Sequence, residues 1–180
     1  MIFGDGIRLR AVENSDLPQF VGWLNDPEVI QNLAIYAPLS MADEESWFEG
    51  MRARPADERP LVIEAQLEAD WVMIGTCGFH NIDWRSRSAE VGIFIGDKSC
   101  WDRGYGTRIM KLLVQYGFET LNLNRIMLDV YETNPRAIRA YQKAGFVHEG
   151  RKRQANYQNG EYHDVLIMSV LHQEWDARNA

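Results

Sequence analysis

Hydrophobic and polar residues alternate in the middle of the chain with the two-residue period of a β-strand. Three strands rich in β-branched and aromatic residues are predicted here, at residues 61–67, 71–80 and 88–95. We expect these three successive strands to form an antiparallel meander. A further strand is predicted near the start, at residues 7–12, and a loop with two prolines at residues 52–60.

Four other segments repeat apolar residues with the period of an α-helix. Ser15 or Asp16 can cap the first of them, and Asn134 and Pro135 are suited to begin the last, which Gly145 ends. The apolar positions or limits of the four helices are Leu17, Phe20, Val21 and Leu24; residues 41–51; Ile109, Leu112, Leu113, Tyr116 and Thr120; and Ala137, Ile138, Tyr141 and Ala144.

The last third of the chain adds strands to this pattern. One is predicted at residues 125–130, and two more, at 147–157 and 161–172, flank the dipeptide Asn159-Gly160, a strong hairpin signal. The order of elements is helix pair, meander, helix, strand, helix and hairpin. This is a mixed α/β fold and differs from the regular alternation of a dinucleotide-binding domain.

Length and composition favour one domain over residues 1–180. The chain has 180 residues, of which 46% are hydrophobic, enough for one continuous core. Its longest apolar runs, such as residues 91–95, are far shorter than the roughly 18 residues that suggest a membrane span. The first residues carry no export signal, so a cytoplasmic protein is expected.

Charge and cysteine content narrow the classes of partner. A net charge of −7 disfavours nucleic acid, which binds to clustered Lys and Arg. Cationic substrates suit this charge, although many proteins are acidic only for solubility. Cys77 and Cys100 have no metal-like spacing with the four histidines, so reduced thiols and no metal site are expected.

A glycine-bearing run, residues 103–107, lies between the strand that ends at Ile95 and the third helix. Glycines allow the backbone to approach a ligand closely, and the N-terminus of a helix favours a phosphate. Arg103 can add a charge-assisted hydrogen bond. A tight turn that only permits packing explains the same residues. Neither a P-loop nor a third glycine for a dinucleotide fingerprint is present, which disfavours an ATPase or an NAD enzyme.

With this motif the chain resembles the GNAT superfamily of acetyltransferases. The family signature is Gln or Arg, two variable residues, Gly, one variable residue, and Gly or Ala; here it reads Trp101-Asp-Arg-Gly-Tyr-Gly106, with Trp101 in place of Gln or Arg. A second block, residues 134–146, is similar to the family pattern Asn-x-x-Ala-x-x-x-Tyr-x-Lys-x-Gly-Phe. The branch that the chain resembles contains the ribosomal-protein alanine acetyltransferases and the spermidine acetyltransferases.

The resemblance implies a GNAT-like fold, with a central, mostly antiparallel twisted sheet of about seven strands flanked by about four helices. It also implies acetyl-coenzyme A as the acetyl donor. Backbone groups of residues 93–95 would pair with the pantetheine, residues 103–107 would hold the pyrophosphate, and residues of the second block would face the thioester. The coenzyme-binding residues expected on this basis are Ile93, Phe94, Ile95, Arg103, Gly104, Tyr105, Gly106, Thr107, Asn134, Ala137 and Tyr141.

The expected reaction is direct attack of a primary amine on the thioester within a ternary complex. Tyr141 is the expected acid for the leaving thiolate, and Glu90 is the expected base. Core packing of Tyr141 and an ordinary paired role of Glu90 are the alternatives. A backbone N–H near Phe94 or Ile95 would stabilise the oxyanion. The four histidines are interpreted as ordinary strand or surface residues.

The acceptor is expected to be a protein N-terminus, a polyamine or another small amine. Acidic side chains on the N-terminal helices are either walls of its pocket or a solvated surface: Glu28, Asp43, Glu44, Glu45 and Glu49. A homodimer is expected as the assembly, without nucleic acid or membrane partners. The alternative function is a non-catalytic sensor or assembly module that binds acyl-coenzyme A.

Overall fold

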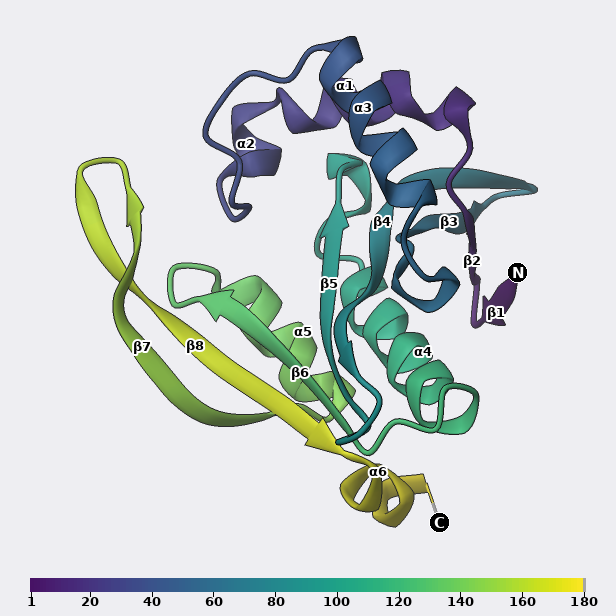
Figure 1. Cartoon of the computed structure of the whole chain (residues 1–180), viewed down its shortest axis with the longest axis vertical. Helices are drawn as coiled ribbons and strands as arrows, with labels where there is room; N and C mark the ends of the chain where they lie inside the picture. Colours follow the sequence, from purple (N-terminus) through teal and green to yellow (C-terminus); the bar gives the residue numbers. More distant parts are fainter. Residues whose placement is uncertain (180) are drawn as a thin grey trace. The chain divides into compact units, whose positions relative to one another are not determined.

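The computed structural model describes residues 1–179 (Figure 1). The chain divides into two compact units. Unit 1 comprises Met1–Phe79 and Gly92–Tyr105, and unit 2 comprises His80–Val91 and the chain from Gly106 onward. The prediction of one functional domain stays a prediction. No helix within residues 1–179 combines the length and the apolar character needed to cross a membrane.

The strands follow the order β1-β2-β3-β4-β5-β6-β8-β7 in an eight-stranded sheet. β4 and β5 contribute residues to both units. The registers of β1–β2, β2–β3, β3–β4, β6–β8 and β7–β8 are antiparallel, whereas β5 and β6 run parallel. The strands are β1 (Ile2–Gly4), β2 (Ile7–Ala11), β3 (Leu61–Leu67), β4 (Asp70–Asp83), β5 (Ser88–Ile95), β6 (Arg125–Tyr131), β7 (Val147–Gln158) and β8 (Glu161–Leu171).

The four predicted helices are all present, and two further helices accompany them. The helices are α1 (Leu17–Leu24), α2 (Pro27–Ile30), α3 (Met41–Arg52), α4 (Tyr105–Glu119), α5 (Pro135–Ala144) and α6 (His172–Asn179). Short 3-10 turns, η1 to η3, lie at Asn14–Asp16, Ala56–Glu58 and Lys98–Cys100. The mixed α/β fold with a mostly antiparallel sheet is therefore confirmed. β1 raises the number of strands above the expected seven, and β8 ends one residue earlier than predicted because His172 begins α6.

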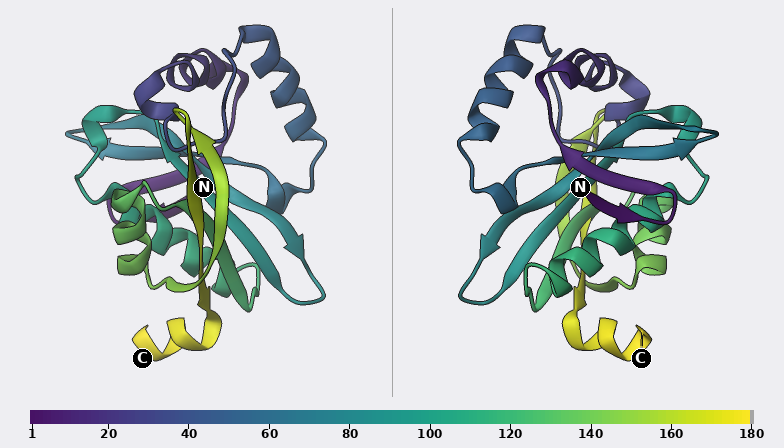
Figure 2. Two further views of the ribbon diagram at one scale, coloured as in Figure 1. Left: turned by 90° about the vertical axis from the view of Figure 1, so that its left-hand side faces the viewer. Right: turned by 90° about the vertical axis from the view of Figure 1, so that its right-hand side faces the viewer.

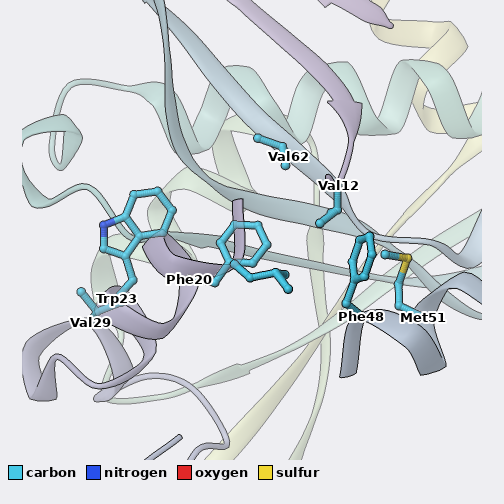
Figure 3. Close-up of a cluster of buried hydrophobic side chains, with 8 residues drawn as sticks. Val12, Phe20, Trp23, Val29, Phe48, Met51 and Val62 are labelled. Atoms are coloured by element: carbon cyan, nitrogen blue, oxygen red, sulfur yellow. The ribbon is translucent and has the colours of Figure 1, made fainter. Parts of the chain in front are cut away.

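A cluster of aromatic and aliphatic side chains forms the core under the helices of unit 1. Figure 3 shows the Phe20 ring with Trp23 on one side and Phe48 on the other. Ring centroids lie 6.3 Å apart for Phe20 and Trp23, and 6.2 Å apart for the edge-on pair of Phe20 and Trp47. The buried members, hereafter the helix cluster, are Val12, Leu17, Phe20, Trp23, Val29, Phe48, Met51 and Val62.

Unit 2 contains the most regular local signals of the chain. The Asn134 side chain caps α5 by accepting a hydrogen bond from the backbone N–H of Ala137, at 3.1 Å. Gly145 ends the helix with φ +106°. In the β7–β8 hairpin, Asn159 and Gly160 both have positive φ, as a type I′ hairpin turn requires. α6 lies beyond the end of β8 in both views of Figure 2.

A network of buried charges ties β2 to β3 and to η1 in unit 1. The Arg10 guanidinium donates to both carboxylate oxygens of Asp16, at 2.7 and 2.8 Å, and to Glu64 at 2.8 Å. Arg8 donates to the other oxygen of Glu64. Burial by itself would raise the pKa of Asp16 and Glu64, but these hydrogen bonds outweigh it and lower both pKa values.

We expect Arg10→Met to lower the free energy of unfolding by about 3–5 kcal/mol, because it leaves the buried carboxylate of Asp16 without its cation and Glu64 with Arg8 alone. Arg52→Met, which breaks an exposed pair with Glu49, should cost about 1 kcal/mol or less. Urea denaturation measures both. An equal, small loss would show that the network contributes little.

The same measurement has a pH dependence with a fixed sign. Asp16 and Glu64 have lowered folded-state pKa values, so their stabilisation is present above the unfolded pKa of about 4 and is lost as the pH falls through the folded values. The acid-dependent loss should therefore be smaller in Arg10→Met than in the unmodified protein.

Candidate functional site

The backbone at the end of β5 has one edge paired with β4 and one edge turned away from it. The N–H of Gly96 donates to the Ile74 carbonyl of β4 at 2.9 Å. Backbone groups alternate between the two edges along a strand, so Ile93 and Ile95 present theirs to the edge away from β4. The register of β5 with β6 covers only Ser88, Ala89 and Glu90. Of the three predicted pantetheine-binding residues, Ile93 and Ile95 therefore have the better orientation.

Gly75 of β4 permits the close approach of β5 at this end. A Cβ atom at position 75 would lie 2.1 Å from the Phe94 carbonyl oxygen and 2.9 Å from the Ile95 Cα. Any larger residue would push the backbone of β5 aside. The Phe94 ring packs edge-on against Trp23 of the helix cluster, with centroids 6.3 Å apart. Phe94 thus anchors the strand, while its two neighbours offer backbone groups.

Trp101 connects the end of β5 to the glycine turn that follows. Its indole N–H donates to the Ile95 carbonyl at 2.8 Å, and its ring packs against the helix cluster. In the family signature this position is Gln or Arg. In this chain Trp101 occupies it and donates a hydrogen bond to the backbone of Ile95 in the same unit. The sequence motif did not reveal this role, because the contact depends on how the loop folds back.

The predicted phosphate-binding turn has the backbone conformation of an open helix start. Asp102 and Gly104 have positive φ angles of 58° and 80°, and α4 begins at Tyr105. A Cβ atom at position 104 would meet no atom within 4 Å, so space in front of the turn is open. The Arg103 side chain is exposed, whereas Tyr105 is buried. Thr107 lies in the first turn of α4.

The second predicted block lies on α5, in unit 2. Asn134 uses its side-chain oxygen for the helix cap, which leaves its Nδ2 as the group that could donate to a ligand. Gly106 of α4 faces α5, since a Cβ there would be in ordinary van der Waals contact with the Ala140 Cβ, at 3.7 Å. Burial raises the pKa of Tyr141 to about 12, so its phenol is protonated at neutral pH.

Glu90 is paired with a histidine that sequence reasoning treated as ordinary. The Nε2 atom of His80 on β4 lies 3.2 Å from Oε2 of Glu90 on β5, and both side chains are partly exposed. The alternation of side chains within a strand gives the face on which each residue lies. It does not pair His80 with Glu90, because that contact depends on the register of β4 and β5. Within residues 1–179, no group of three or more metal-ligating side chains lies close enough to hold an ion.

The predicted site residues are thus divided between the two units, and each unit assembles its own share. Unit 1 holds the outward backbone edge of β5, the hydrogen bond from Trp101 to Ile95, and the start of the glycine turn. Unit 2 holds the capped helix, the phenol and the acid–histidine pair. The unit 1 members are Ile93, Phe94, Ile95, Arg103, Gly104 and Tyr105, and the unit 2 members are Glu90, Gly106, Thr107, Asn134, Ala137 and Tyr141.

A sheet of this topology and an open glycine turn before α4 together define an acyltransferase of the GNAT class. Residues 7–147 match the acetyltransferase (GNAT) domain family. The chain belongs to this family and is an enzyme of the acetyltransferase class. Membership of this family also confirms the expected acetyl donor, acetyl-coenzyme A.

Several known proteins are similar along most of their length. The chain is 31% identical to spermidine N(1)-acetyltransferase of Vibrio cholerae over 169 residues, 94% of this chain and 95% of the relative. It is 35% identical to the putative ribosomal N-acetyltransferase YdaF of Bacillus subtilis over 114 residues, 63% of this chain and 62% of the relative.

The fold is also shared with a solved enzyme. The crystal structure of spermidine N-acetyltransferase from Vibrio cholerae, in complex with CoA and spermine, superposes with a TM-score of 0.84. It has 29% sequence identity and covers 94% of this chain and 98% of that chain. The expected resemblance to the spermidine and ribosomal-protein branch is confirmed.

We expect Trp101→Phe to reduce both stability and coenzyme affinity. The variant keeps an aromatic ring but leaves the Ile95 carbonyl without its donor, which should cost about 1 kcal/mol of unfolding free energy. The dissociation constant of coenzyme A, measured by calorimetry, should rise several-fold because the strand end is no longer fixed. Trp84→Phe, at a side chain that is 52% exposed, is the control and should change neither quantity. If Trp101→Phe bound coenzyme A as tightly as the unmodified protein, the indole hydrogen bond would contribute to folding but not to coenzyme binding.

Proposed function

We propose that this enzyme moves the acetyl group of acetyl-coenzyme A to a primary amine by direct attack in a ternary complex. The observation that carries the proposal is the hydrogen bond from the Trp101 indole to the Ile95 carbonyl in unit 1. It links the outward edge of β5 to the glycine turn before α4. An extended amide chain and a pyrophosphate require these two features. Polyamines are the first acceptors to test, since relatives of similar length are spermidine acetyltransferases.

The donor would bind through backbone groups more than through charge. The outward N–H and C=O groups of Ile93 can pair with the pantetheine amides as an added strand does, whereas the Ile95 carbonyl is already bonded to the Trp101 indole. The N–H groups at the start of α4, with the exposed Arg103 beside them, would bind the pyrophosphate. Glycine at position 104 leaves room for that group.

The acetyl transfer would proceed through a tetrahedral intermediate. The amine nitrogen attacks the thioester carbon, and the carbonyl oxygen becomes an oxyanion that the Ile95 N–H stabilises. The C–S bond then breaks, the thiolate takes a proton from the Tyr141 phenol, and the phenolate is reprotonated by the proton that the amide nitrogen loses. A phenol with a pKa of about 12 gives its proton reluctantly to a thiolate, whose thiol has a pKa of about 8.5. The contribution of Tyr141 should therefore be about 10²–10⁴-fold at most.

The attacking amine must also lose a proton, and the size of this requirement depends on the acceptor. At pH 7 an α-amine is about one-tenth neutral, whereas an alkylamine is neutral only about once in 2,500, a penalty of roughly 4.6 kcal/mol. The Glu90–His80 pair is the proposed proton acceptor, acting directly or through a water molecule. A polyamine needs this pair far more than a peptide N-terminus does.

Release of free thiol from acetyl-coenzyme A tests the function directly. We expect turnover with at least one acceptor from a panel of polyamines, peptides with free N-termini and amino sugars. Tyr141→Phe should lower kcat by 10²–10⁴-fold while leaving coenzyme affinity nearly unchanged, because it removes only the proton. Tight coenzyme binding without turnover of any amine, unaffected by Tyr141→Phe, would instead indicate a sensor or assembly module.

A matched pair of glycine variants tests the phosphate turn. Gly104 and Gly160 both have positive φ, at 80° and 88°, and neither has an atom within 4 Å of an added Cβ. Gly104→Ala and Gly160→Ala should therefore cost a similar strain of about 1–2 kcal/mol in unfolding free energy. Only Gly104→Ala should also weaken coenzyme A binding, by tenfold or more in calorimetry. Equal coenzyme affinity in the two variants would support a turn that serves packing alone.

A further inference from the structure

The last helix of the chain, α6, contacts the ends of two helices that carry predicted site residues of unit 2. Phe118, near the end of α4, stacks on His172 with ring centroids 4.9 Å apart, and its ring lies 5.9 Å from that of Trp175. Toward the other end of α6, the guanidinium of Arg178 donates to the carbonyl of Gly145 at 2.7 Å. α6 therefore joins the C-terminal ends of α4 and α5 (Figure 1).

The carbonyl that Arg178 binds belongs to the turn that ends α5. Carbonyl groups at the end of a helix lack intrahelical donors, and a cation there suits the negative end of the helix dipole. A Cβ atom at position 145 would lie 2.4 Å from Nη1 of Arg178, so a larger residue would displace the guanidinium. Gly145 thus provides both the left-handed conformation of the turn and the space for this contact.

The same turn fixes the backbone and the ring of Tyr141. The backbone N–H of Phe146 donates to the Tyr141 carbonyl at 3.0 Å, and the N–H of Gly145 donates to Tyr141 and Gln142. The Phe146 ring is buried and packs beside the Tyr141 ring, with centroids 6.1 Å apart. The position of the Tyr141 phenol therefore depends on how firmly residues 145 and 146 are held.

Arg178 acts on this turn and not on the charge of the phenol. Burial is the cause that raises the pKa of Tyr141 to about 12. The side chain of Arg178 is bound to a backbone carbonyl, four residues beyond Tyr141. A change at position 178 should therefore alter where the phenol lies and leave its protonation as it is.

We propose that Arg178 is a positioning residue for Tyr141, because it holds closed the turn that ends α5. The proposal rests on the proposed acetyl transfer, in which the Tyr141 phenol protonates the thiolate. Proton donation depends steeply on geometry, and a displacement of about 1 Å can cost about 100-fold in rate. A looser turn at residues 145 and 146 should therefore reduce turnover although the phenol is still present.

Steady-state kinetics of Arg178→Gln test the proposal. Glutamine is shorter than arginine and carries no charge, so it removes the contact with Gly145. We expect kcat to fall by about tenfold, with the dissociation constant of coenzyme A and KM for the amine within about twofold of the unmodified enzyme. Asp176→Asn, which changes another exposed polar side chain of α6, is the matched control and should leave all three quantities unchanged.

A double-mutant cycle separates positioning from a general structural role. Tyr141→Phe lacks the phenol, so adding Arg178→Gln to it should change kcat by less than about twofold. A full tenfold loss in the Tyr141→Phe background would overturn the proposal, since Arg178 would then act through another group. An unchanged kcat in Arg178→Gln alone would overturn it as well.

Amide hydrogen exchange, followed by NMR, tests the turn without any turnover. The N–H groups of Gly145 and Phe146 should exchange about tenfold faster in Arg178→Gln than in Asp176→Asn. If no amine releases thiol, the proposed acetyl transfer fails, yet faster exchange at these two amides would still support the hold of Arg178 on the turn. Equal exchange rates in the two variants would overturn the proposal whatever the kinetics show.

A folding control accompanies these measurements. Arg178 is exposed, so Arg178→Gln should melt cooperatively, within about 5 °C of the unmodified protein. If its melting is not cooperative, Arg178→Met provides the same comparison, since it also removes the guanidinium but keeps an apolar side chain of similar reach. Values of kcat and exchange rates in Arg178→Met that equal those of the unmodified protein would count against the proposal.

Discussion

Backbone hydrogen bonding at the end of β5 is the constraint on which the proposed coenzyme site depends. A polar backbone group away from water needs a partner. β4 supplies partners along one edge, and Gly75 allows β5 to come close enough for this. On the other edge the Trp101 indole takes the Ile95 carbonyl. The Trp101 side chain thus gives the last carbonyl of β5 a hydrogen-bond donor and fixes the loop that leads to α4.

Charge pairing gives unit 1 a second kind of order. Arg8 and Arg10 lie on β2, and the carboxylates that they neutralise come from β3 and from η1. β2 and β3 are far apart in the sequence, so the ion pairs with Glu64 also help to fix their register.

Most of the fold could be predicted from local patterns, and the exceptions have local reasons. The period of α4 and α5, the cap at Asn134 and the turn at Asn159-Gly160 are signals that a few neighbouring residues carry. β1 and α2, of three and four residues, are too short to show a period. α6 begins at His172, where the alternating pattern of β8 runs on without a break signal.

The candidate site was less predictable, because its key contacts join residues that are distant in sequence. Gly104 and Tyr141 stand in motifs, and so could be named from the sequence. The pairing of His80 with Glu90 requires the register of two strands, and the Trp101 bond requires the path of a loop.

The two proton transfers of the proposed reaction, one to the thiolate and one from the amine, bear on the choice of acceptor. A phenol with a pKa near 12 stays protonated throughout the physiological range, so Tyr141 can serve as an acid for any acceptor. The demand for a base, in contrast, rises about 250-fold from an α-amine to an alkylamine. An enzyme for peptide N-termini would gain little from the paired Glu90 and His80. An enzyme for polyamines would use that pair to take a proton from the reacting nitrogen.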